Sequence, residues 1–197
     1  MTGLDKAALR LALGEARQNV PHRGVKANQI AKNLTALLAP SPPPVLGLYY
    51  PIQGEVDVSP FWETWQGPMA LPTVIQKHLV FRLWHSGDPL TSGPFGIPEP
   101  LPTAQAVTPH TLLVPCVGVD TAGHRLGYGQ GYYDRYLAAH PEIHSIGVIF
   151  AVQQVSVLPT EPHDQRLGAV VTEMGLTNPT PMARSGDGAN TRGEGSQ

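Results

Sequence analysis

The sequence has only one cysteine, Cys116, among its 197 residues. A single cysteine excludes an intramolecular disulfide and favours a reducing compartment. The chain also lacks any run near the roughly 18 apolar residues that a membrane-spanning helix needs, and its N-terminal segment lacks the apolar core of a signal peptide. Excess positive charge is missing as well, since the formal net charge is −2. This balance argues against nucleic-acid binding through bulk electrostatics, so we expect a soluble, cytoplasmic protein with no membrane or nucleic-acid partner.

Glycine and proline, by contrast, are abundant, with 21 of each. They separate apolar segments instead of forming a repeat, which is typical of a globular chain. With 41% hydrophobic residues, the chain is long enough for one α/β domain with a substantial core. Residues 178–197 are rich in Gly, Pro, Ser, Thr and Asn, a composition typical of flexible segments. We therefore predict a single domain over residues 1–177, followed by a flexible C-terminal tail over residues 178–197.

Two helices are predicted near the N-terminus. Thr2 and Asp5 have capping-box spacing ahead of a helical run that ends before Pro21. In that run the apolar positions expected on the core face are Leu9, Leu13, Ala16 and Val20, and an adjoining face carries Lys6, Arg10 and Arg17. A second helix is predicted over residues 27–38, where the proline cluster 40–44 ends it.

The segments that follow alternate between strand and helix patterns. Continuously apolar runs predict strands at residues 45–50, 69–75, 79–83, 112–119, 143–150 and 169–172, and helices are predicted at 59–65 and 132–140. Continuous rather than alternating hydrophobicity indicates a sheet that is covered on both faces. We therefore predict a three-layer α/β/α fold with a mostly parallel central sheet, Rossmann-like in architecture. The proline-rich stretch 86–110 is predicted to be a long functional loop.

The segment Gly127–Gly131 alternates glycine with other residues just before the predicted helix at 132–140. Glycines let the backbone approach a ligand closely, and the helix N-terminus adds a partial charge of about +0.5, so the pattern suits a phosphate. Arg125 and Arg135 flank it, and Asp134 is a carboxylate of the kind that Mg²⁺ prefers. The spacing matches neither a P-loop nor a dinucleotide fingerprint. On these residues alone, a tight strand-to-helix turn without a ligand is an equal alternative.

The longer string at residues 114–135, VPCVGVDTAGHRLGYGQGYYDR, resembles the signature of the 5-formyltetrahydrofolate cyclo-ligase family. Further family motifs occur in the same order along the chain, namely Lys6 with Arg10, GEVD at 54–57, FGIPEP at 95–100, IGV at 146–148 with Gln153, and LP…HD at 158–164. The resemblance extends to about Glu173. It implies that ATP and Mg²⁺ drive conversion of 5-formyltetrahydrofolate to 5,10-methenyltetrahydrofolate. ADP and phosphate are released, through a phosphorylated formyl (imino-phosphate) intermediate.

The same resemblance implies roles for individual residues. Those expected to bind ATP are Lys6, Arg10, Arg125, Leu126, Gly127, Tyr128, Gly129, Gln130, Gly131, Tyr132 and Tyr133. Those expected to bind the folate are Tyr50, Glu55, Phe95, Tyr128, Gly129, Gln130, Gly131 and Tyr132. Arg125, Tyr132 and Asp134 are expected to be catalytic, and Asp134 and Asp164 to contact the metal. The partners are then small-molecule substrates, bound by a monomer.

Three positions depart from the family pattern. Position 128 is Tyr where other members have Arg, position 130 is Gln where many have Lys or Gly, and position 168 is Gly where an Asp is expected. These departures motivate an alternative, a catalytically silent folate- or nucleotide-binding protein of the same fold. A kinase-like or sugar-phosphate-binding protein of the same broad architecture is a third hypothesis. Without the resemblance, Lys6 and Arg10 would form a solvated helix face, and Tyr50 would be a core residue.

Overall fold

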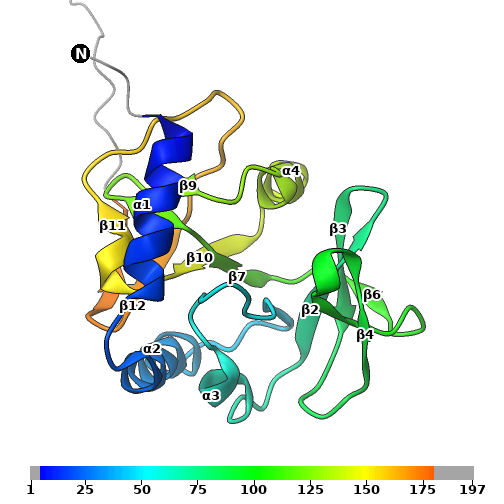
Figure 1. The fold of residues 1–197 in the computed structure, drawn as a ribbon. Helices are drawn as coiled ribbons and strands as arrows, with labels where there is room; N and C mark the ends of the chain where they lie inside the picture. The colour runs from blue at the N-terminus through cyan, green and yellow to red at the C-terminus, as the bar shows by residue number, and fades with distance from the viewer. Residues whose placement is uncertain (1–4, 180–197) are drawn as a thin grey trace, which may run out of the picture.

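The computed structural model describes residues 5–179, and within these residues the main element is an eight-stranded sheet (Figure 1). The strand order is β13-β12-β10-β7-β1-β2-β3-β6. The strands are β1 (Leu46–Gly47), β2 (Met69–Ile75), β3 (His78–Leu83), β6 (Ala106–Val107), β7 (Thr111–Pro115), β10 (His144–Val148), β12 (Ala169–Thr172) and β13 (Gly175–Thr177). From β12 to β2 neighbouring strands run parallel, and the outer strands β13, β3 and β6 pair antiparallel. The prediction of a mostly parallel central sheet is confirmed.

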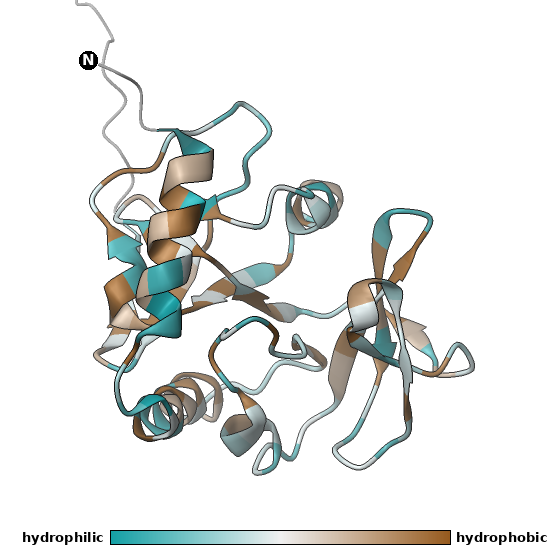
Figure 2. Cartoon of the chain, in the orientation of Figure 1, coloured by the Kyte–Doolittle hydropathy of each residue, from teal (hydrophilic) through white to brown (hydrophobic). Residues whose placement is uncertain are grey.

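Both faces of this sheet are buried under helices, which explains the continuous apolar runs. On one face, Leu113 of β7 packs with Ile30 and Leu34 of α2 (Arg23–Leu38), next to the short helix α3 (Ser59–Trp62). On the other face, Leu112 of β7 packs with Leu137 of α4 (Tyr132–Ala139). Successive residues of one strand therefore serve two different cores. Figure 2 shows the hydrophobic colouring along the central strands.

The first helix, α1 (Lys6–Gln18), begins at Asp5, whose carboxylate accepts a hydrogen bond from the Ala7 amide at 3.0 Å. Thr2, the other half of the predicted capping box, lies outside the described residues. The helix shows alternating hydrophobic and hydrophilic bands (Figure 2), and Leu13 packs with Leu126 and Leu158 in a third apolar cluster. This cluster holds α1 beside β9 and β11 (Figure 1), so its N-terminal half stands next to the glycine loop.

Other helix boundaries differ from the sequence prediction. α2 begins at Arg23, four residues before the predicted start at 27, because His22 takes up a left-handed conformation (φ 52°) that starts a new helix directly after Pro21. α3 ends at Trp62 and not at residue 65. No helix within residues 5–179 is long and apolar enough to cross a membrane. The predicted flexible tail lies outside the described residues from 180 onward, and it stays a prediction together with the single domain over residues 1–177.

The strand predicted at 112–119 is wrong as one element, because the structure divides it between two sheets. β7 ends at Pro115, and β8 (Gly118–Asp120) belongs to a separate three-stranded sheet with β9 (Arg125–Leu126) and β11 (Gln154–Val155). An apolar run cannot show such a change of partner, since both halves are equally buried. Likewise, the run predicted at 143–150 leaves the sheet after Val148, and the one at 45–50 pairs only at Leu46–Gly47.

The predicted long loop at 86–110 is also wrong, since it contains three short strands. β4 (Leu90–Ser92) pairs antiparallel with β5 (Pro98–Pro100) around a 3₁₀ turn at Pro94–Gly96, and β6 joins the edge of the main sheet through β3. The prolines argued against strands in this segment, because proline cannot donate a ladder hydrogen bond. They are tolerated here because these short strands need no donor at their ends and edges. This small sheet forms one wall of the cavity described next.

Candidate active site

A cavity of about 460 Å³ lies between α1, the glycine loop, the β2–β3 hairpin and the β4–β5 sheet. Its volume is in the range of small-molecule binding sites, about 300–1,000 Å³. Every site residue predicted from the sequence lines it: Lys6, Arg10, Tyr50, Glu55, Phe95, Arg125, Leu126, Gly127, Tyr128, Gly129, Gln130, Gly131, Tyr132, Tyr133, Asp134 and Asp164. Segments far apart in the sequence therefore meet at one place, while the role of each residue stays a prediction.

The glycine loop connects β9 to α4 and has the backbone shape that its glycines allow. Gly129 (φ 90°) and Gly131 (φ 63°) are in left-handed conformations that favour glycine. Gly131 is the N-cap of α4 and offers no side chain to the first amides of the helix. Those amides are thus left for another acceptor, and the helix dipole favours an anion there. A β-carbon at Gly131 would lie 2.9 Å from Nη1 of Arg135, which donates to the Gln130 carbonyl.

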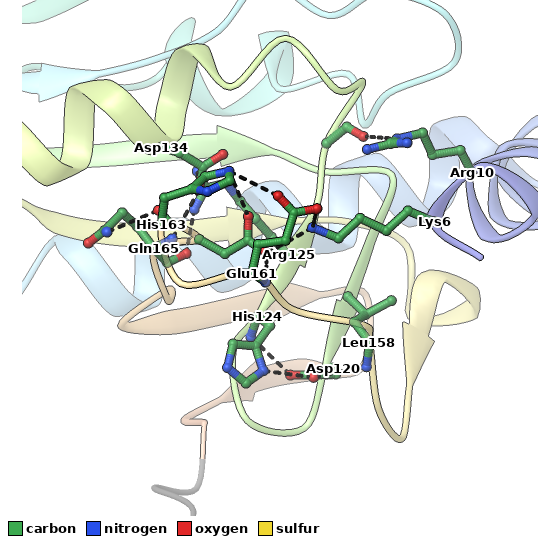
Figure 3. Close-up of polar contacts among 12 residues, drawn as sticks. Lys6, Arg10, Asp120, His124, Arg125, Asp134, Leu158, Glu161, His163 and Gln165 are labelled. Carbon is green, nitrogen blue, oxygen red and sulfur yellow. Dashed lines mark hydrogen bonds and ion pairs between the residues drawn. The ribbon is translucent and has the colours of Figure 1, made fainter. Parts of the chain in front are cut away.

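Lys6 and Arg10 extend from α1 toward the loop and the cavity (Figure 3). Arg10 Nε donates to the Gly127 carbonyl at 2.8 Å. Lys6 Nζ lies 2.9 Å from Asp164 Oδ2 and 3.0 Å from Glu161 Oε1. Burial alone would lower the pKa of Lys6, but hydrogen bonds to these two carboxylates outweigh burial and raise it. Both cations therefore line the cavity, while their role in binding ATP stays a prediction.

Arg125 and Asp134 form the centre of the site. Arg125 Nη2 lies 2.7 Å from Asp134 Oδ1, and Nη1 donates to the Gln165 carbonyl at 2.6 Å. The Nη2 contact is an ion pair without hydrogen-bond alignment, since that nitrogen is buried and has no aligned acceptor in residues 5–179. Asp134 Oδ1 also accepts from the Gln165 amide at 3.0 Å. The two side chains thus join the glycine loop to the 161–165 segment (Figure 3).

Asp134 and Asp164 each keep one carboxylate oxygen available. Within residues 5–179, neither Asp134 Oδ2 nor Asp164 Oδ1 has a hydrogen-bond partner, and the contact of Asp164 Oδ1 with His163 Nε2, at 3.9 Å, is too long for a hydrogen bond. Residues 5–179 contain no group of three or more His, Cys, Asp or Glu side chains that could hold a metal. Mg²⁺ is usually bound by one or two carboxylates together with phosphates and water. The donor set therefore fits a Mg²⁺ ion that arrives with a phosphate ligand, and not a metal held by protein ligands alone.

The far end of the cavity is built around Glu55, whose side chain is almost fully buried. Its Oε1 accepts from the Tyr128 hydroxyl at 2.9 Å, and its Oε2 accepts from the Ile52 amide at 3.0 Å. Burial raises the pKa of Glu55, and burial together with the Glu55 charge raises the pKa of Tyr128, which keeps the phenol a donor. Tyr50 lines this end and packs on Trp62 at a ring distance of 6.1 Å, so it is a cavity residue and a core residue at once.

Phe95 and Glu99, both from the FGIPEP motif, complete this wall. Phe95 is 74% exposed, has a left-handed backbone (φ 65°) and lines the cavity. Glu99 is buried and accepts from the Val74 amide at 3.1 Å. Sequence reasoning missed Glu99, although the motif contains it, because nothing local shows that a carboxylate between two prolines is buried. It also missed the cavity contacts of Glu161 and His163, which depend on how the 158–167 segment folds back.

Behind the site, the buried side chains of Asp120 and His124 form a hydrogen-bond chain with the exposed Arg166 (Figure 3 labels the first two). Asp120 Oδ2 lies 2.9 Å from His124 Nδ1, and Arg166 Nε donates to His124 Nε2 at 3.0 Å. Because Nε2 must accept from arginine, Nδ1 carries the proton and donates to Asp120. Asp120 Oδ2 also accepts from the Leu158 amide at 3.1 Å. This chain fixes the 158–167 segment against the hairpin that carries Arg125.

Two further residues lie outside the cavity lining. Cys116 is buried, and burial raises its pKa to about 12, in agreement with a structural thiol. Gly168 does not line the cavity, and its amide donates to the Ser145 carbonyl at 2.9 Å. The missing carboxylate at position 168 therefore removes no group from the cavity wall.

Comparison with known proteins agrees with this geometry. The model of the 5-formyltetrahydrofolate cyclo-ligase family matches residues 3–173. The chain is 33% identical to a 5-formyltetrahydrofolate cyclo-ligase of Haemophilus influenzae over 60% of this chain and 70% of the relative. It is 32% identical to one of Escherichia coli K12 over 66% and 81%. A solved 5,10-methenyltetrahydrofolate synthetase of Aquifex aeolicus superposes with a TM-score of 0.79 at 28% identity, covering 95% of this chain and 99% of that one. The chain is therefore an enzyme that belongs to the 5-formyltetrahydrofolate cyclo-ligase family.

Proposed function

We propose that this chain converts 5-formyltetrahydrofolate to 5,10-methenyltetrahydrofolate at the expense of ATP, with Mg²⁺, releasing ADP and phosphate. The observation that carries the proposal is the two-ended character of the cavity. One end has Lys6, Arg10 and the uncapped N-terminus of α4, and the other has a buried carboxylate, Glu55, among aromatic side chains. The first end suits a polyphosphate, and the second suits a flat ring with a hydrogen-bond donor edge. The glycine loop Gly127–Gly131 lies between them.

At the phosphate end, the chain supplies positive charge from three elements. Lys6 and Arg10 come from α1, Arg125 comes from β9, and the loop adds backbone amides. Phosphoryl transfer depends mainly on positioning and charge neutralisation, so these groups match what the reaction requires. Leu126 and Tyr133 line the wall beneath the loop. Gln130 adds a neutral amide to the cavity lining.

Asp134 and Asp164 would hold Mg²⁺ through the oxygen atoms that remain free of hydrogen bonds. The ion, when bound with ATP, would neutralise negative charge on the phosphate oxygens. Lys6 would keep Asp164 ionised before the nucleotide arrives, and Arg125 would hold Asp134 in place through their ion pair. In agreement, burial alone would raise the pKa of Asp164, but the hydrogen bond and charge of Lys6, the Glu161 amide and the His163 charge together outweigh burial and hold that pKa below its usual value.

In the proposed reaction, the formyl oxygen attacks the γ-phosphorus and the bond to the bridging oxygen breaks, so ADP leaves. The nitrogen at position 10 then adds to the activated formyl carbon, loses its proton, and expels phosphate as the carbon–oxygen bond breaks. An amide-like oxygen leaves poorly until it is phosphorylated, which is why ATP is required. Arg125 would stabilise charge on the transferred group together with Tyr132, the first residue of α4, which also lines the cavity.

At the other end, Glu55 would accept hydrogen bonds from the pterin, with Tyr50, Phe95 and Tyr128 around the ring. Glu55 Oε1 and Oε2 each have one hydrogen-bond donor from the protein. A carboxylate has about four lone-pair positions, so acceptor capacity is left for a ligand. We further propose that the enzyme acts as a monomer in the cytoplasm, where its folate substrate and ATP are both present.

A chromogenic assay tests the proposal directly. Protein, 5-formyltetrahydrofolate and Mg²⁺ are mixed with and without ATP, and the methenyl absorbance and ADP are followed together. We expect both to rise in equal amounts, and only when ATP is present. Calorimetric binding of folate or ATP without any turnover would instead select a silent binding protein, the alternative that Gln130 and Gly168 motivate. ADP formation that does not depend on folate would favour a kinase-like activity.

A further inference from the structure

Arg17 is an arginine of α1 that the proposed reaction does not use, yet its side chain is 97% buried, being only 3% exposed. Its Nη2 donates to the Gln53 carbonyl at 2.9 Å. Its Nε and Nη1 have no hydrogen-bond acceptor in the part of the chain that the structure describes. Burying a guanidinium with incomplete pairing is costly. Such a charge needs a role beyond packing, and its neighbours indicate one.

Arg17 lies directly behind the folate end of the cavity. Its Cζ is 5.5 Å from the centroid of the Tyr128 ring, within the range of a cation–π contact. The Tyr128 hydroxyl in turn donates to Glu55 Oε1 at 2.9 Å. Tyr128 and Glu55 line the cavity, whereas Arg17 does not. The three side chains, from three separate segments, therefore form a stack that runs from α1 through the cavity wall to the substrate end.

The charge on Arg17 acts on Glu55. Burial raises the pKa of Glu55, while the Ile52 amide, the Tyr128 hydroxyl and the Arg17 charge lower it. The other titratable or charged groups around the buried carboxylate are Tyr49, Tyr133, Cys116, Asp57 and Arg23. Of these, Arg23 is the remaining cation, and its Nη2 is directed at the Gly54 carbonyl at 2.6 Å. Arg17 is therefore the positive charge that opposes protonation of Glu55.

We propose that Arg17 is a positioning residue for folate binding, which holds Tyr128 against Glu55 and keeps the Glu55 carboxylate ionised as an acceptor for the substrate. The inference rests on the proposed function. It explains how this chain manages with tyrosine at position 128, where other family members have arginine. The positive charge is that of Arg17, which lies against the Tyr128 ring and outside the cavity lining. The Tyr128 hydroxyl in turn donates a hydrogen bond to Glu55.

Two variants of Arg17 separate charge from packing. Arg17→Met keeps the approximate volume and removes the charge, while Arg17→Lys keeps the charge and shortens the side chain. The matched control is Arg82→Met, because Arg82 is also partly buried and donates to a backbone carbonyl, that of Ala104, but lies outside the cavity lining. For each protein we would measure kcat, KM for 5-formyltetrahydrofolate and KM for ATP between pH 5 and pH 9. Calorimetric binding of 5-formyltetrahydrofolate without ATP gives a second readout.

With Arg17→Met we expect the acid limb of folate binding to move up by about one pH unit, the usual size of a single charge effect on a neighbouring carboxyl. At a pH below the Glu55 pKa, raising that pKa by about one lowers the ionised fraction of Glu55 about tenfold, so KM for the folate and its Kd rise to the same extent. KM for ATP stays within about twofold of wild type, because the Arg17 charge acts on Glu55, which lies at the folate end of the cavity. Arg17→Lys restores the wild-type pH profile, and Arg82→Met leaves every parameter unchanged.

Several results would overturn this role. A folded Arg17→Met variant with a wild-type pH profile removes the charge effect, and equal loss in Arg17→Met and Arg17→Lys without a displaced pH profile identifies a packing role. If Arg17→Met does not fold, Arg17→Lys and Tyr128→Phe decide, because Tyr128→Phe should also move the acid limb upward by removing a donor to Glu55. Failure of the proposed function is distinguishable, since wild-type protein would then form no methenyl product at any pH.

Discussion

Replacing Asp134 should separate its contribution to the fold from its contribution to turnover. Asp134 Oδ1 lies 2.7 Å from Arg125 Nη2 and accepts from the Gln165 amide at 3.0 Å. Asp134→Ala leaves the Arg125 guanidinium, whose side chain is 4% exposed, without a counter-charge. Removing one partner of a fully buried pair costs about 3–5 kcal/mol. Because the Asp134 side chain is 21% exposed, solvent screening reduces the expected loss to about 2 kcal/mol.

Asp134→Asn is the matched variant, because it keeps an oxygen for the Gln165 amide and removes only the charge. The hydrogen bond that Asp134→Asn keeps is worth about 1 kcal/mol. We therefore expect this variant to lose about 1 kcal/mol of stability, roughly half the loss of Asp134→Ala. For a chain of this length, 1 kcal/mol corresponds to about 2–4 °C in Tm. Both variants should nevertheless lose turnover by about 10²-fold or more, as when a group that stabilises transition-state charge is removed. The loss of turnover should thus be similar in the two variants, whereas the loss of stability should differ.

The assay is methenyl formation at saturating substrates over a series of Mg²⁺ concentrations, together with urea unfolding of each variant. Asp88→Asn is the control, because Asp88 is an exposed carboxylate outside the cavity. We expect the apparent KM for Mg²⁺ to rise in both Asp134 variants and to stay unchanged in Asp88→Asn. Wild-type turnover in a folded Asp134→Asn variant would remove Asp134 from the metal site. Loss of turnover only in proportion to loss of folded protein would leave it a structural residue.

Three further predictions concern single features. Gly131→Ala should lose about 1 kcal/mol of stability, because Gly131 has a left-handed backbone (φ 63°). It should also raise KM for ATP more than KM for the folate. Equal changes in both KM values would contradict a phosphate role for the loop. Native Cys116 should resist alkylation up to pH 9, since burial raises its pKa to about 12, and rapid labelling of folded protein would refute this. The Lys6–Asp164 pair should stabilise the fold above pH 3.8, the ordinary Asp164 pKa, because its folded-state pKa is lower; this stabilisation is lost as the pH falls further. Wild type and Lys6→Met should accordingly differ in urea midpoint at pH 7 and converge at pH 2, and a constant difference would refute the pairing.

The sequence alone was sufficient for the layers of the fold, because both sheet faces are buried and the strands are therefore continuously apolar. Met69–Ile75 and Ala169–Thr172 are strands with the predicted bounds, and Tyr132–Ala139 differs by one residue from the predicted helix. Prediction from the sequence failed where the burial of a strand does not reveal which strand it pairs with. Residues 112–119 are apolar throughout, yet β7 and β8 belong to different sheets.

For the site, motifs predicted from the sequence line the cavity, since they are local strings of unusual residues. The glycine loop, Lys6 with Arg10, and Asp164 are examples. Arg17 was predicted only as one more cation on a helix face, although it is 3% exposed in the structure. No local pattern distinguishes it from Arg10, which is also on α1, because what buries Arg17 is Gln53 and Tyr128 from distant segments.

The amino-acid sequence by itself therefore determined the family, the parallel sheet between helices and many of the residues that line the cavity. Only the tertiary structure decided how their charges are paired. It places Arg125 against Asp134, Lys6 between Glu161 and Asp164, and Arg17 behind Tyr128. The physical reason is that residue type and periodicity encode burial along the chain, whereas an ion pair is a distance between segments. That distance is set by how the cores on the two faces of the sheet pack.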